Sequence, residues 1–317
     1  MRVLPGLALL WLASAGQAMS TDAVRGIALK IEPVSAQCGV QAMPPPALPA
    51  AAQQRLAQSQ AVHGKKDIAL AWLGSPTSRY PHAAFGSPVH AGSLHVLVAD
   101  TSGALQQLTL NLPAQRVFED RLLRLADLDG DGRDEIIVVE ADAAQGAALV
   151  VFGVRAVAPV VGAAASPALV EVARGPSIGT AFRWLNPAGV ADFDGDGRPD
   201  LASVTTPHIG GVLTLHHFRP PHLVPFARAA DVSNHRYGAL EQQLAVVIET
   251  PGRRPTVVVP DMQYTALHAL RWDAPGQWSR LEEPQALRAR IERLTPMPGG
   301  ACALLADGSW WRVTLAR

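Results

Sequence analysis

The stretch Asp127-Leu-Asp-Gly-Asp-Gly-Arg-Asp-Glu135 recurs almost unchanged as Asp192-Phe-Asp-Gly-Asp-Gly-Arg-Pro-Asp200. In both copies, acidic side chains stand at relative positions 1, 3, 5 and 9. Oxygen ligands at this spacing on a tight, glycine-containing loop converge on one point, as a hard cation such as Ca2+ requires. One such segment alone could be a solvated acidic turn. Two in the same phase predict a pair of calcium loops, because without a cation the carboxylates of each loop would repel one another.

The residues around the two loops argue against an EF-hand. An EF-hand loop closes with a glutamate at position 12, between two helices. Here position 12 is Val138 in the first loop and Ser203 in the second. The segments 135–140 and 200–206 that follow are short, apolar and rich in β-branched residues, which is typical of buried strands. The sequence therefore predicts a strand, a calcium loop and a second strand, used twice.

The segments 126–135 and 191–200 resemble the calcium loops of FG-GAP, or VCBS, repeats. Such repeats build the seven-bladed β-propeller of integrin α subunits and occur in many exported bacterial proteins. The specific match covers these two loops, and weaker periodicity extends it over most of residues 63–317. The resemblance implies two Ca2+ sites, each formed by carboxylates and one backbone carbonyl. The implied ligands are Asp127, Asp129, Asp131, the carbonyl of Arg133 and Glu135, then Asp192, Asp194, Asp196, the carbonyl of Arg198 and Asp200.

Short apolar runs recur along the chain as expected for the blades of a propeller. Such runs begin at residues 67, 135, 200, 256 and 302. Each is followed by a second strand-like run, at 94–99, 148–154, 212–218, 266–272 and 310–315. Regular repetition of strand-rich units is typical of propellers. We therefore predict an all-β fold over residues 63–317, a β-propeller of about five four-stranded antiparallel blades, with six or seven blades as alternatives.

A third segment can be aligned with the two calcium loops but lacks their acidic residues. Aligned on the second calcium loop, residues 246–257 keep the pair Arg254-Pro255. The ligand positions, however, hold Ile248, Thr250, Gly252 and Thr256. We expect a hairpin here that has lost its metal, so that two calcium sites are predicted and no more.

The N-terminal part differs in composition from the rest of the chain. Residues 1–18 combine Arg2, an apolar run and small residues, which is typical of a secretory signal peptide. Residues 19–62 are expected to be an extended segment and linker, with a polyproline-like stretch at 43–49 and a short helix or loop at 50–60. Residues 27–31 could form a strand that completes a blade. An exported protein, periplasmic or extracellular, without membrane insertion after cleavage, is predicted.

The charge of the chain bears on its partners, and its cysteine content bears on a possible disulfide. The chain has 27 basic and 27 acidic residues, and its arginines are scattered, which argues against a nucleic-acid partner. Its two cysteines, Cys38 and Cys302, are an even number in an expected exported chain, so a disulfide between them is one expectation and two free thiols the other. In a propeller this bond would clasp the ends of the ring. A monomer is expected.

Polar and aromatic residues in several loops suggest a second site. Segments 76–82, 205–211, 183–187 and 233–237 carry unusual clusters of such residues. If their loops share one face of the propeller, a pocket for a sugar or an anion could be formed by Arg79, Tyr80, His82, Trp184, Asn186 and His208. The alternative is that these side chains cap blade edges and satisfy loop carbonyls. His216 and His217 are strand neighbours that point to opposite faces, so they are not expected to chelate one ion together.

The residues favour a non-enzymatic function. The chain has no Gly-x-Ser-x-Gly elbow, His-Glu-x-x-His motif or phosphate-binding glycine loop. We therefore predict an exported, calcium-stabilised β-propeller that serves as a binding or scaffolding module for a protein or carbohydrate partner. The alternative is a polysaccharide-active enzyme or sugar-binding protein with a site on one face of the propeller. The fold alone does not decide between them.

Overall fold

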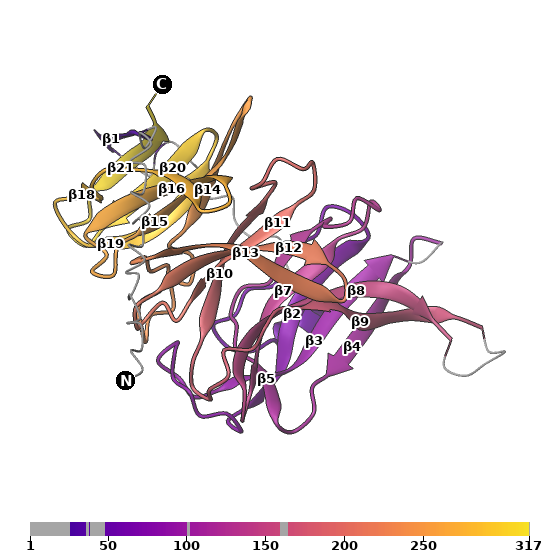
Figure 1. Ribbon diagram of the computed structural model, residues 1–317. Coiled ribbons are helices and arrows are strands. Elements are labelled where there is room, and N and C mark those ends of the chain that lie inside the picture. Colours follow the sequence, from indigo (N-terminus) through magenta and orange to yellow (C-terminus); the bar gives the residue numbers. More distant parts are fainter. Residues whose placement is uncertain (1–25, 36–37, 39–47, 100–101, 159–163, 317) are drawn as a thin grey trace, which may run out of the picture.

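Antiparallel β-strands make up nearly all regular structure in the computed structural model, which describes residues 26–35, 38, 48–99, 102–158 and 164–316 (Figure 1). Within these ranges the one helix is α1 (Ala50–Gln53), where a short helix or a loop was expected. The all-β prediction is confirmed. The expected signal peptide, residues 1–18, lies outside the described residues.

The strands differ in length and carry the labels of Figure 1. In chain order they are β1 (Leu29–Val34), β2 (Ile68–Thr77), β3 (His90–Ala99), β4 (Leu105–Asn111), β5 (Arg116–Phe118), β6 (Arg124–Ala126), β7 (Glu135–Asp142), β8 (Gly146–Val157), β9 (Ser166–Arg174), β10 (Leu185–Ala191), β11 (Asp200–Thr205), β12 (Val212–Arg219), β13 (His222–Ala230), β14 (Val246–Thr250), β15 (Arg253–Pro260), β16 (Ala266–Ala274), β17 (Gln277–Arg280), β18 (Gln285–Ala286), β19 (Ile291–Met297), β20 (Gly300–Leu305) and β21 (Trp310–Leu315).

The described strands form sheets of four, twelve and five strands. Their orders are β1-β21-β20-β19 for the first, β10-β11-β12-β13-β9-β8-β7-β5-β3-β2 with β4 on β3 and β6 on β7 for the second, and β14-β15-β16-β17 with β18 on β16 for the third. In the largest sheet, a single parallel pairing, His222 with Arg174, connects β13 to β9. A similar single pairing, Ala91 with Phe118, connects β3 to β5. Within this sheet, backbone pairing between these groups of consecutive strands is limited to these points, and none of the three described sheets closes on itself.

All five pairs of apolar runs expected from the sequence form antiparallel strand pairs. They are β2 with β3, β7 with β8, β11 with β12, β15 with β16 and β20 with β21. The strand β7 shows why these runs are so apolar, because its first seven residues are buried and therefore packed on both faces of the sheet. The segment 246–257, expected to be a hairpin without acidic ligands, contains β14 and the start of β15, which pair antiparallel.

The core lies between neighbouring groups of strands. One apolar cluster contains Leu73 and Leu94 of the first hairpin together with Phe118 and Phe152. The rings of Phe118 and Phe152 meet edge to face, with centroids 5.9 Å apart. A second cluster joins the β10–β13 group to β15 and β16, where Trp272 packs. Each group thus covers the apolar face of the next.

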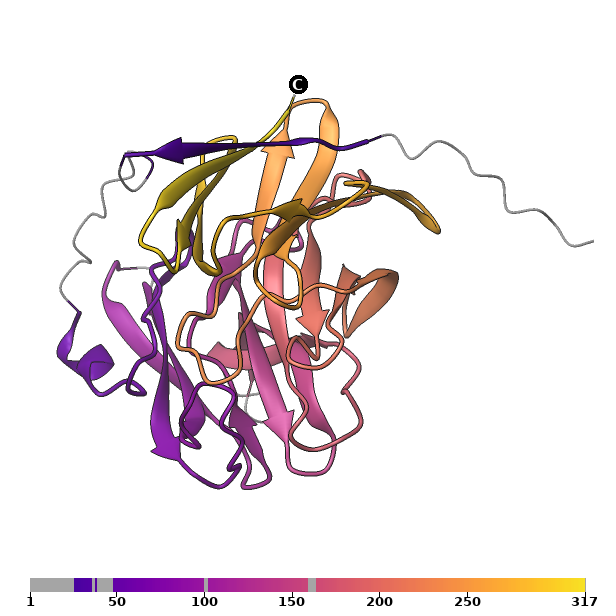
Figure 2. The same ribbon diagram turned by 90° about the vertical axis from the view of Figure 1, so that its left-hand side faces the viewer.

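The N-terminal strand β1 completes the C-terminal sheet, where it lies beside β21 (Figure 2). Its pairing runs from Leu29 opposite Leu315 to Val34 opposite Trp310. Shortly after β1, Cys38 forms a disulfide with Cys302 of β20, and the two Cα atoms are 5.9 Å apart. The expectation of a disulfide is confirmed, and such a bond fits an exported protein. Most of the polyproline-like stretch 43–49 lies outside the described residues.

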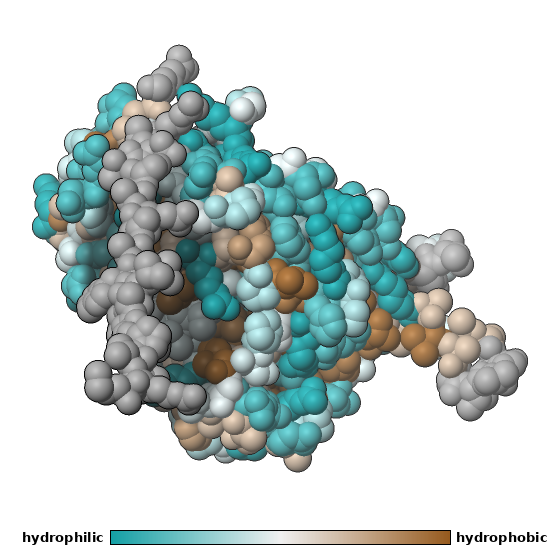
Figure 3. All heavy atoms as spheres, viewed as in Figure 1, coloured by the Kyte–Doolittle hydropathy of each residue, from teal (hydrophilic) through white to brown (hydrophobic). Residues whose placement is uncertain are grey.

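One face of the molecule is mainly polar. On the face seen in Figure 1, hydrophilic residues predominate and apolar ones form small separate patches (Figure 3). None of the helices in the described ranges is long and apolar enough to cross a membrane.

Candidate functional site

The two acidic loops have the same backbone design. The first connects β6 to β7, and the second connects β10 to β11. At the start of the first loop, Asp127 accepts a hydrogen bond from the amide of Gly132 at 3.0 Å. In the second, Asp192 accepts one from Gly197 at 2.9 Å. Both glycines have a φ of 85°, a conformation that strongly favours glycine, so the glycines of the motif permit the turn.

Carboxylate oxygens converge in both loops. Two groups place their oxygens within 4.8 Å of one another: Asp127, Asp129 and Glu135 in the first loop, and Asp192, Asp194 and Asp196 in the second. A tight loop that offers several carboxylates has the chemistry of a site for a hard divalent cation. In each loop, three of the four predicted carboxylate ligands thus come together.

The carboxylate at relative position 9 is buried in each loop. Glu135 accepts a hydrogen bond from the amide of Leu128 at 2.9 Å, and Asp200 accepts one from Phe193 at 3.2 Å. Burial raises the pKa of the Glu135 carboxyl, and it raises the pKa of Asp200 to about 6. A bound cation would favour the ionised form of both groups, because it supplies the positive charge that these sites need.

The carboxylates at position 5 are turned toward arginines. Asp131 pairs with Arg133 of its own loop at 2.7 Å, whereas Asp196 pairs with Arg219 of β12 at 3.0 Å. The amides of Arg133 and Arg198 each donate to the preceding aspartate at 2.9 Å. The exposed rim of both loops is therefore already partly neutralised by the protein.

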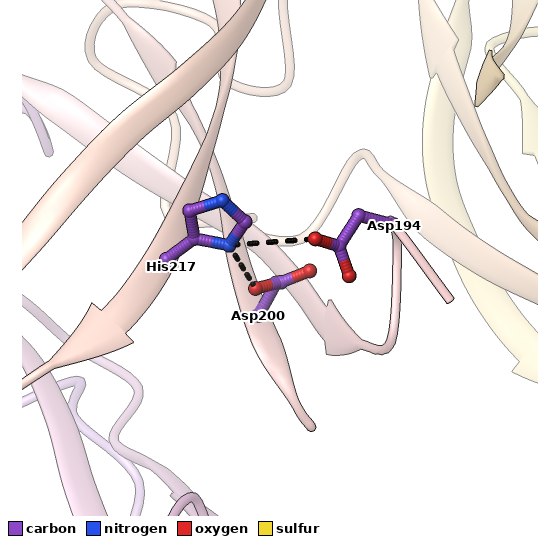
Figure 4. A group of neighbouring side chains, drawn as sticks. All are labelled: Asp194, Asp200 and His217. Atoms are coloured by element: carbon purple, nitrogen blue, oxygen red, sulfur yellow. Dashed lines mark hydrogen bonds and ion pairs between the residues drawn. The ribbon is translucent and has the colours of Figure 1, made fainter. Parts of the chain in front are cut away.

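An imidazole joins the second loop (Figure 4). The Nδ1 atom of His217 lies 3.0 Å from Asp200 and 3.8 Å from Asp194, and the three residues form a further group able to hold a metal. The ring also stacks on Phe226, with centroids 4.0 Å apart. Sequence reasoning missed His217. The cross-strand pairing of Asp200 with His217 was the available signal, but it requires knowing the β11–β12 register.

A guanidinium occupies the corresponding side of the first loop. Arg155 of β8 lies 2.8 Å from Glu135 and 3.4 Å from Asp129. Lys66 adds a weaker contact, 3.6 Å from Asp127. The first loop therefore carries permanent positive charge where the second carries an imidazole. The two loops look equivalent in sequence, but their surroundings differ.

A separate pocket of about 270 Å³ gathers aromatic and histidine side chains. It is lined by His82, Phe182, Arg183, Trp184, Thr206, His208, Ile209 and Tyr237. Phe182 and Tyr237 are 45% and 60% exposed, so their rings are available to a ligand. His82 follows β2, Phe182 precedes β10, His208 follows β11 and Tyr237 follows β13. Segments far apart in the sequence thus meet in one pocket.

Ring contacts hold the pocket together. Trp184 and His208 stack with centroids 5.6 Å apart and an interplanar angle of 10°, and Tyr237 meets the His208 ring edge to face at 5.2 Å. On the other side, Tyr80 packs on Phe182 at 5.0 Å, and its hydroxyl accepts a hydrogen bond from the Phe182 amide at 2.6 Å. Burial raises the pKa of Tyr80 to about 12, so this hydroxyl stays protonated.

A buried carboxylate stands behind His82. The Glu119 side chain is 0% exposed and lies 2.6 Å from Nδ1 of His82, while its backbone carbonyl accepts a hydrogen bond from the Trp184 indole at 2.9 Å. Loss of solvation raises the pKa of Glu119 to about 7, and the hydrogen bond with His82 limits the rise. The Glu119 carboxyl therefore titrates near neutral pH.

A second pair orients His208. Nε2 of His235 donates to the Ala239 carbonyl at 2.9 Å, because a carbonyl oxygen only accepts. The His235 ring is buried, and burial lowers its pKa to about 3, so it is neutral and its Nδ1 is an acceptor. His208 therefore donates from Nε2 to His235 at 2.8 Å, which leaves its own Nδ1 without a hydrogen.

Four of the six side chains predicted to form a ligand site are brought together here: Tyr80, His82, Trp184 and His208. Arg79 and Asn186 lie elsewhere. Arg79 donates to the Arg116 carbonyl at 2.8 Å, and the buried Asn186 donates to the Gln242 carbonyl at 2.7 Å. These two satisfy loop carbonyls, as the alternative interpretation expected.

Sequence reasoning missed Glu119, Phe182, His235 and Tyr237. The polar cluster at 233–237 was a signal for two of them, and the acidic pair that follows Val117-Phe118 was a weaker one for the first.

No family model matches the chain, and no curated protein matches it. Among solved structures, it is similar to the rhamnogalacturonan lyase YesW, with 13% identity over 68% of this chain and 49% of that one, and a TM-score of 0.32. It is also similar to the exotype rhamnogalacturonan lyase YesX, with 13% identity over 78% of this chain and 56% of that one, and a TM-score of 0.35. The chain thus spans about half the length of these proteins. At such low TM-scores, their lyase activity carries no implication for this chain.

Proposed function

We propose that this protein is an exported, calcium-stabilised β-propeller of about five blades, periplasmic or extracellular, that binds carbohydrate in the pocket formed by His82, Trp184, His208 and Tyr237. The observation that carries the proposal is this pocket, in which exposed aromatic rings surround oriented imidazoles. In this proposal, calcium stabilises the fold and the pocket binds the carbohydrate.

The order of the strands supports a propeller. Five antiparallel hairpins follow one another along the chain, and each group of strands packs on the next. The strand β1 joins β21 in the last group, as it would where a propeller closes on itself. The disulfide between Cys38 and Cys302 would then be a covalent clasp at this closure.

The acidic loops support calcium as the resident cation. Their donors are carboxylate oxygens, which suit Ca2+ better than they suit softer metals. The shared hydrogen bonds of Asp127 and Asp192 position both loops in the same way. Calorimetric titration of Ca2+ into chelator-treated protein should give two binding events and a higher melting temperature. Absence of binding at millimolar calcium would reduce the loops to acidic turns.

The pocket supports a carbohydrate ligand. The rings of Phe182 and Tyr237 offer apolar surface to the C–H face of a sugar, and the imidazoles of His82 and His208 offer hydrogen-bonding atoms to its hydroxyls. A pocket of about 270 Å³ suits one or two sugar units better than a protein surface. A protein partner would be expected to need a larger apolar patch.

Removing an exposed ring tests the binding role. The protein should bind at least one oligosaccharide on an immobilised glycan panel, and Tyr237→Ala should weaken that binding on the order of tenfold. Leu105→Ala is the matched control, since Leu105 is 59% exposed on β4 and does not line the pocket. Equal binding by both variants would place the sugar elsewhere, and an empty panel would contradict the carbohydrate function.

A polysaccharide-active enzyme is the second candidate. A histidine whose Nδ1 is held by a buried carboxylate is oriented as a general base would be, and His82 with Glu119 has this arrangement. New reducing ends released from a panel of polysaccharides, and lost in His82→Gln, would favour this function. Binding without turnover would favour the binding module.

A further inference from the structure

Two imidazole nitrogens decide which polar groups the pocket can bind. His208 presents Nδ1 as an acceptor, because its Nε2 hydrogen is donated to His235. Burial lowers the pKa of His208 to about 4, so it stays an acceptor throughout the neutral range. The other nitrogen is Nε2 of His82, whose Nδ1 faces Glu119 at 2.6 Å. Neither nitrogen has a hydrogen-bond partner among the described residues.

The number of protons on the His82–Glu119 pair determines whether Nε2 of His82 donates or accepts a hydrogen bond. With one proton, the hydrogen must sit between Nδ1 and the carboxylate, because two lone pairs at 2.6 Å would repel, and Nε2 is then bare. With two protons the pair is either imidazolium with carboxylate or imidazole with carboxylic acid. In the first form, and in the second form when the acid hydrogen faces Nδ1, Nε2 carries a hydrogen. Uptake of one proton by the His82 ring, or by the Glu119 oxygen that faces it, therefore converts Nε2 from acceptor to donor.

The other charged and titratable groups that face this pair are Tyr80, His90, Asp120, Arg121 and His208. The pKa of Tyr80 is about 12, and burial lowers the pKa of His90 to about 4. Asp120 is held in an ion pair with Arg124 at 2.9 Å. Arg121 is a permanent cation, and His208 is neutral. A proton on Oε2 of Glu119, which is buried without a partner among the described residues, would leave Nε2 bare, and imidazole 15N resonances distinguish this outcome.

We propose, building on the carbohydrate-binding function above, that the His82–Glu119 pair selects between neutral and acidic sugars. Holding one proton, the pair presents an acceptor to a sugar hydroxyl. Holding two, it presents a donor to a sugar carboxylate. A carboxylate can only accept hydrogen bonds, so two acceptor nitrogens repel it, whereas a hydroxyl can donate to both. Arg183, on the pocket lining, offers positive charge at every pH, so the pH-dependent part of the preference comes from the pair.

Matched ligands make the test direct. Galactotriose and trigalacturonate, and likewise cellotriose and its C6-carboxylate counterpart, differ only in hydroxymethyl against carboxylate. Their affinities are measured by calorimetry at pH values of about 8.5 and about 5.5, on either side of the neutral range. The ratio of acidic to neutral affinity should rise on the order of tenfold upon acidification, the effect of one hydrogen bond to a charged group.

A variant and a spectroscopic measurement identify the residue responsible. Glu119→Gln should remove the pH dependence of the ratio, while Glu140→Gln should keep it, because Glu140 is equally buried but pairs with Arg116 and Arg174 away from the pocket. Imidazole 15N resonances of the wild-type protein should show His82 Nε2 gaining a hydrogen over the same pH range. This measurement decides the matter even if Glu119→Gln does not fold.

Two negative results have different meanings. If either sugar pair binds with a ratio that does not change with pH, or if His82 Nε2 keeps one protonation state, the selection mechanism is wrong and the binding function stands. If neither sugar pair binds at either pH, both the carbohydrate function and the selection mechanism are overturned.

Discussion

Single side chains give the two acidic loops different properties. Arg155 places a guanidinium against Glu135 and Asp129, so a cation entering the first loop must displace or oppose it. His217, which stands beside Asp200 in the second loop, can be neutral. At the scale of one residue, the charge on a neighbouring strand thus changes what an almost identical sequence motif can bind.

We expect Arg155→Gln to increase the Ca2+ affinity of the first loop. Removing a positive charge a few ångströms from the cation should raise that affinity on the order of tenfold. Calorimetric titration in an Asp194→Asn background isolates the first loop, because this change disables the second. Arg219→Gln is the control, since Arg219 contacts only the exposed rim of the second loop at Asp196. Unchanged affinity in Arg155→Gln would mean that the guanidinium moves away without cost.

Asp129→Ala should abolish binding at the first loop and leave the second unaffected. The two loops lie in different strand groups, and their carboxylates form separate clusters among the described residues, so their contributions should be independent. Titration should then show one remaining event with unchanged affinity. Loss of both events would reveal coupling between the loops.

Strands far apart in the sequence depend on one another at the C-terminal sheet. β21 is the partner of β1 on one edge and of β20 on the other, and the disulfide joins the β1 segment to β20. Without β1, the backbone of β21 would be an unpaired edge, which invites association with other chains. The disulfide therefore holds in place the element that covers this edge.

Removing the disulfide should weaken this sheet first. Cys38→Ser with Cys302→Ser frees a loop of 264 residues, which in the chain-entropy estimate costs about 5 kcal/mol of unfolding free energy. Urea titration should measure this loss, and hydrogen exchange should show reduced protection at Leu29–Val34. Wild-type protein under reducing conditions serves as the comparison. Equal stability of the oxidised and serine forms would mean that β1 is held by its pairing alone.

The sequence predicted the elements better than their arrangement. Apolar, β-branched runs such as 135–140 and 200–206 gave strands in the right places, because local apolar patterning decides strand formation. The acidic loops were found for a similar local reason. Contacts such as Arg155 with Glu135, or Glu119 with His82, join residues of different strands or loops, so they depend on register and packing that one sequence does not display. The number of blades stays a prediction.

Acid should destabilise the whole molecule through its buried histidines. Burial lowers the pKa of His90, His208 and His216 to about 4 and that of His235 to about 3. Below their unfolded pKa of 6.5 these groups bind protons in the unfolded chain before the folded one, so stability falls as pH drops from there toward 4. Glu119 and Asp200 have raised pKa values of about 7 and 6, and they oppose this loss.

The net effect should be measurable by chemical unfolding. The free energy of unfolding should decrease by roughly 4 kcal/mol between pH 7 and pH 5. His216→Gln should reduce this decrease by about the contribution of one buried histidine. His222→Gln, at an exposed position on β13, should not change it. A free energy that rises on acidification would mean that the carboxyl groups dominate.

The pairing of β1 with β21 also constrains the order in which the chain can be made and folded. Ribosomes and export channels release a polypeptide from its N-terminus, so Leu29–Val34 emerges long before Trp310–Leu315, its partner. The C-terminal sheet cannot be completed until almost the entire described chain is available, although hairpins such as β7–β8 can form earlier from local segments. During that interval the early strand must remain unpaired and protected from wrong partners, and oxidation of Cys38 and Cys302 to their shared disulfide can only follow at the end.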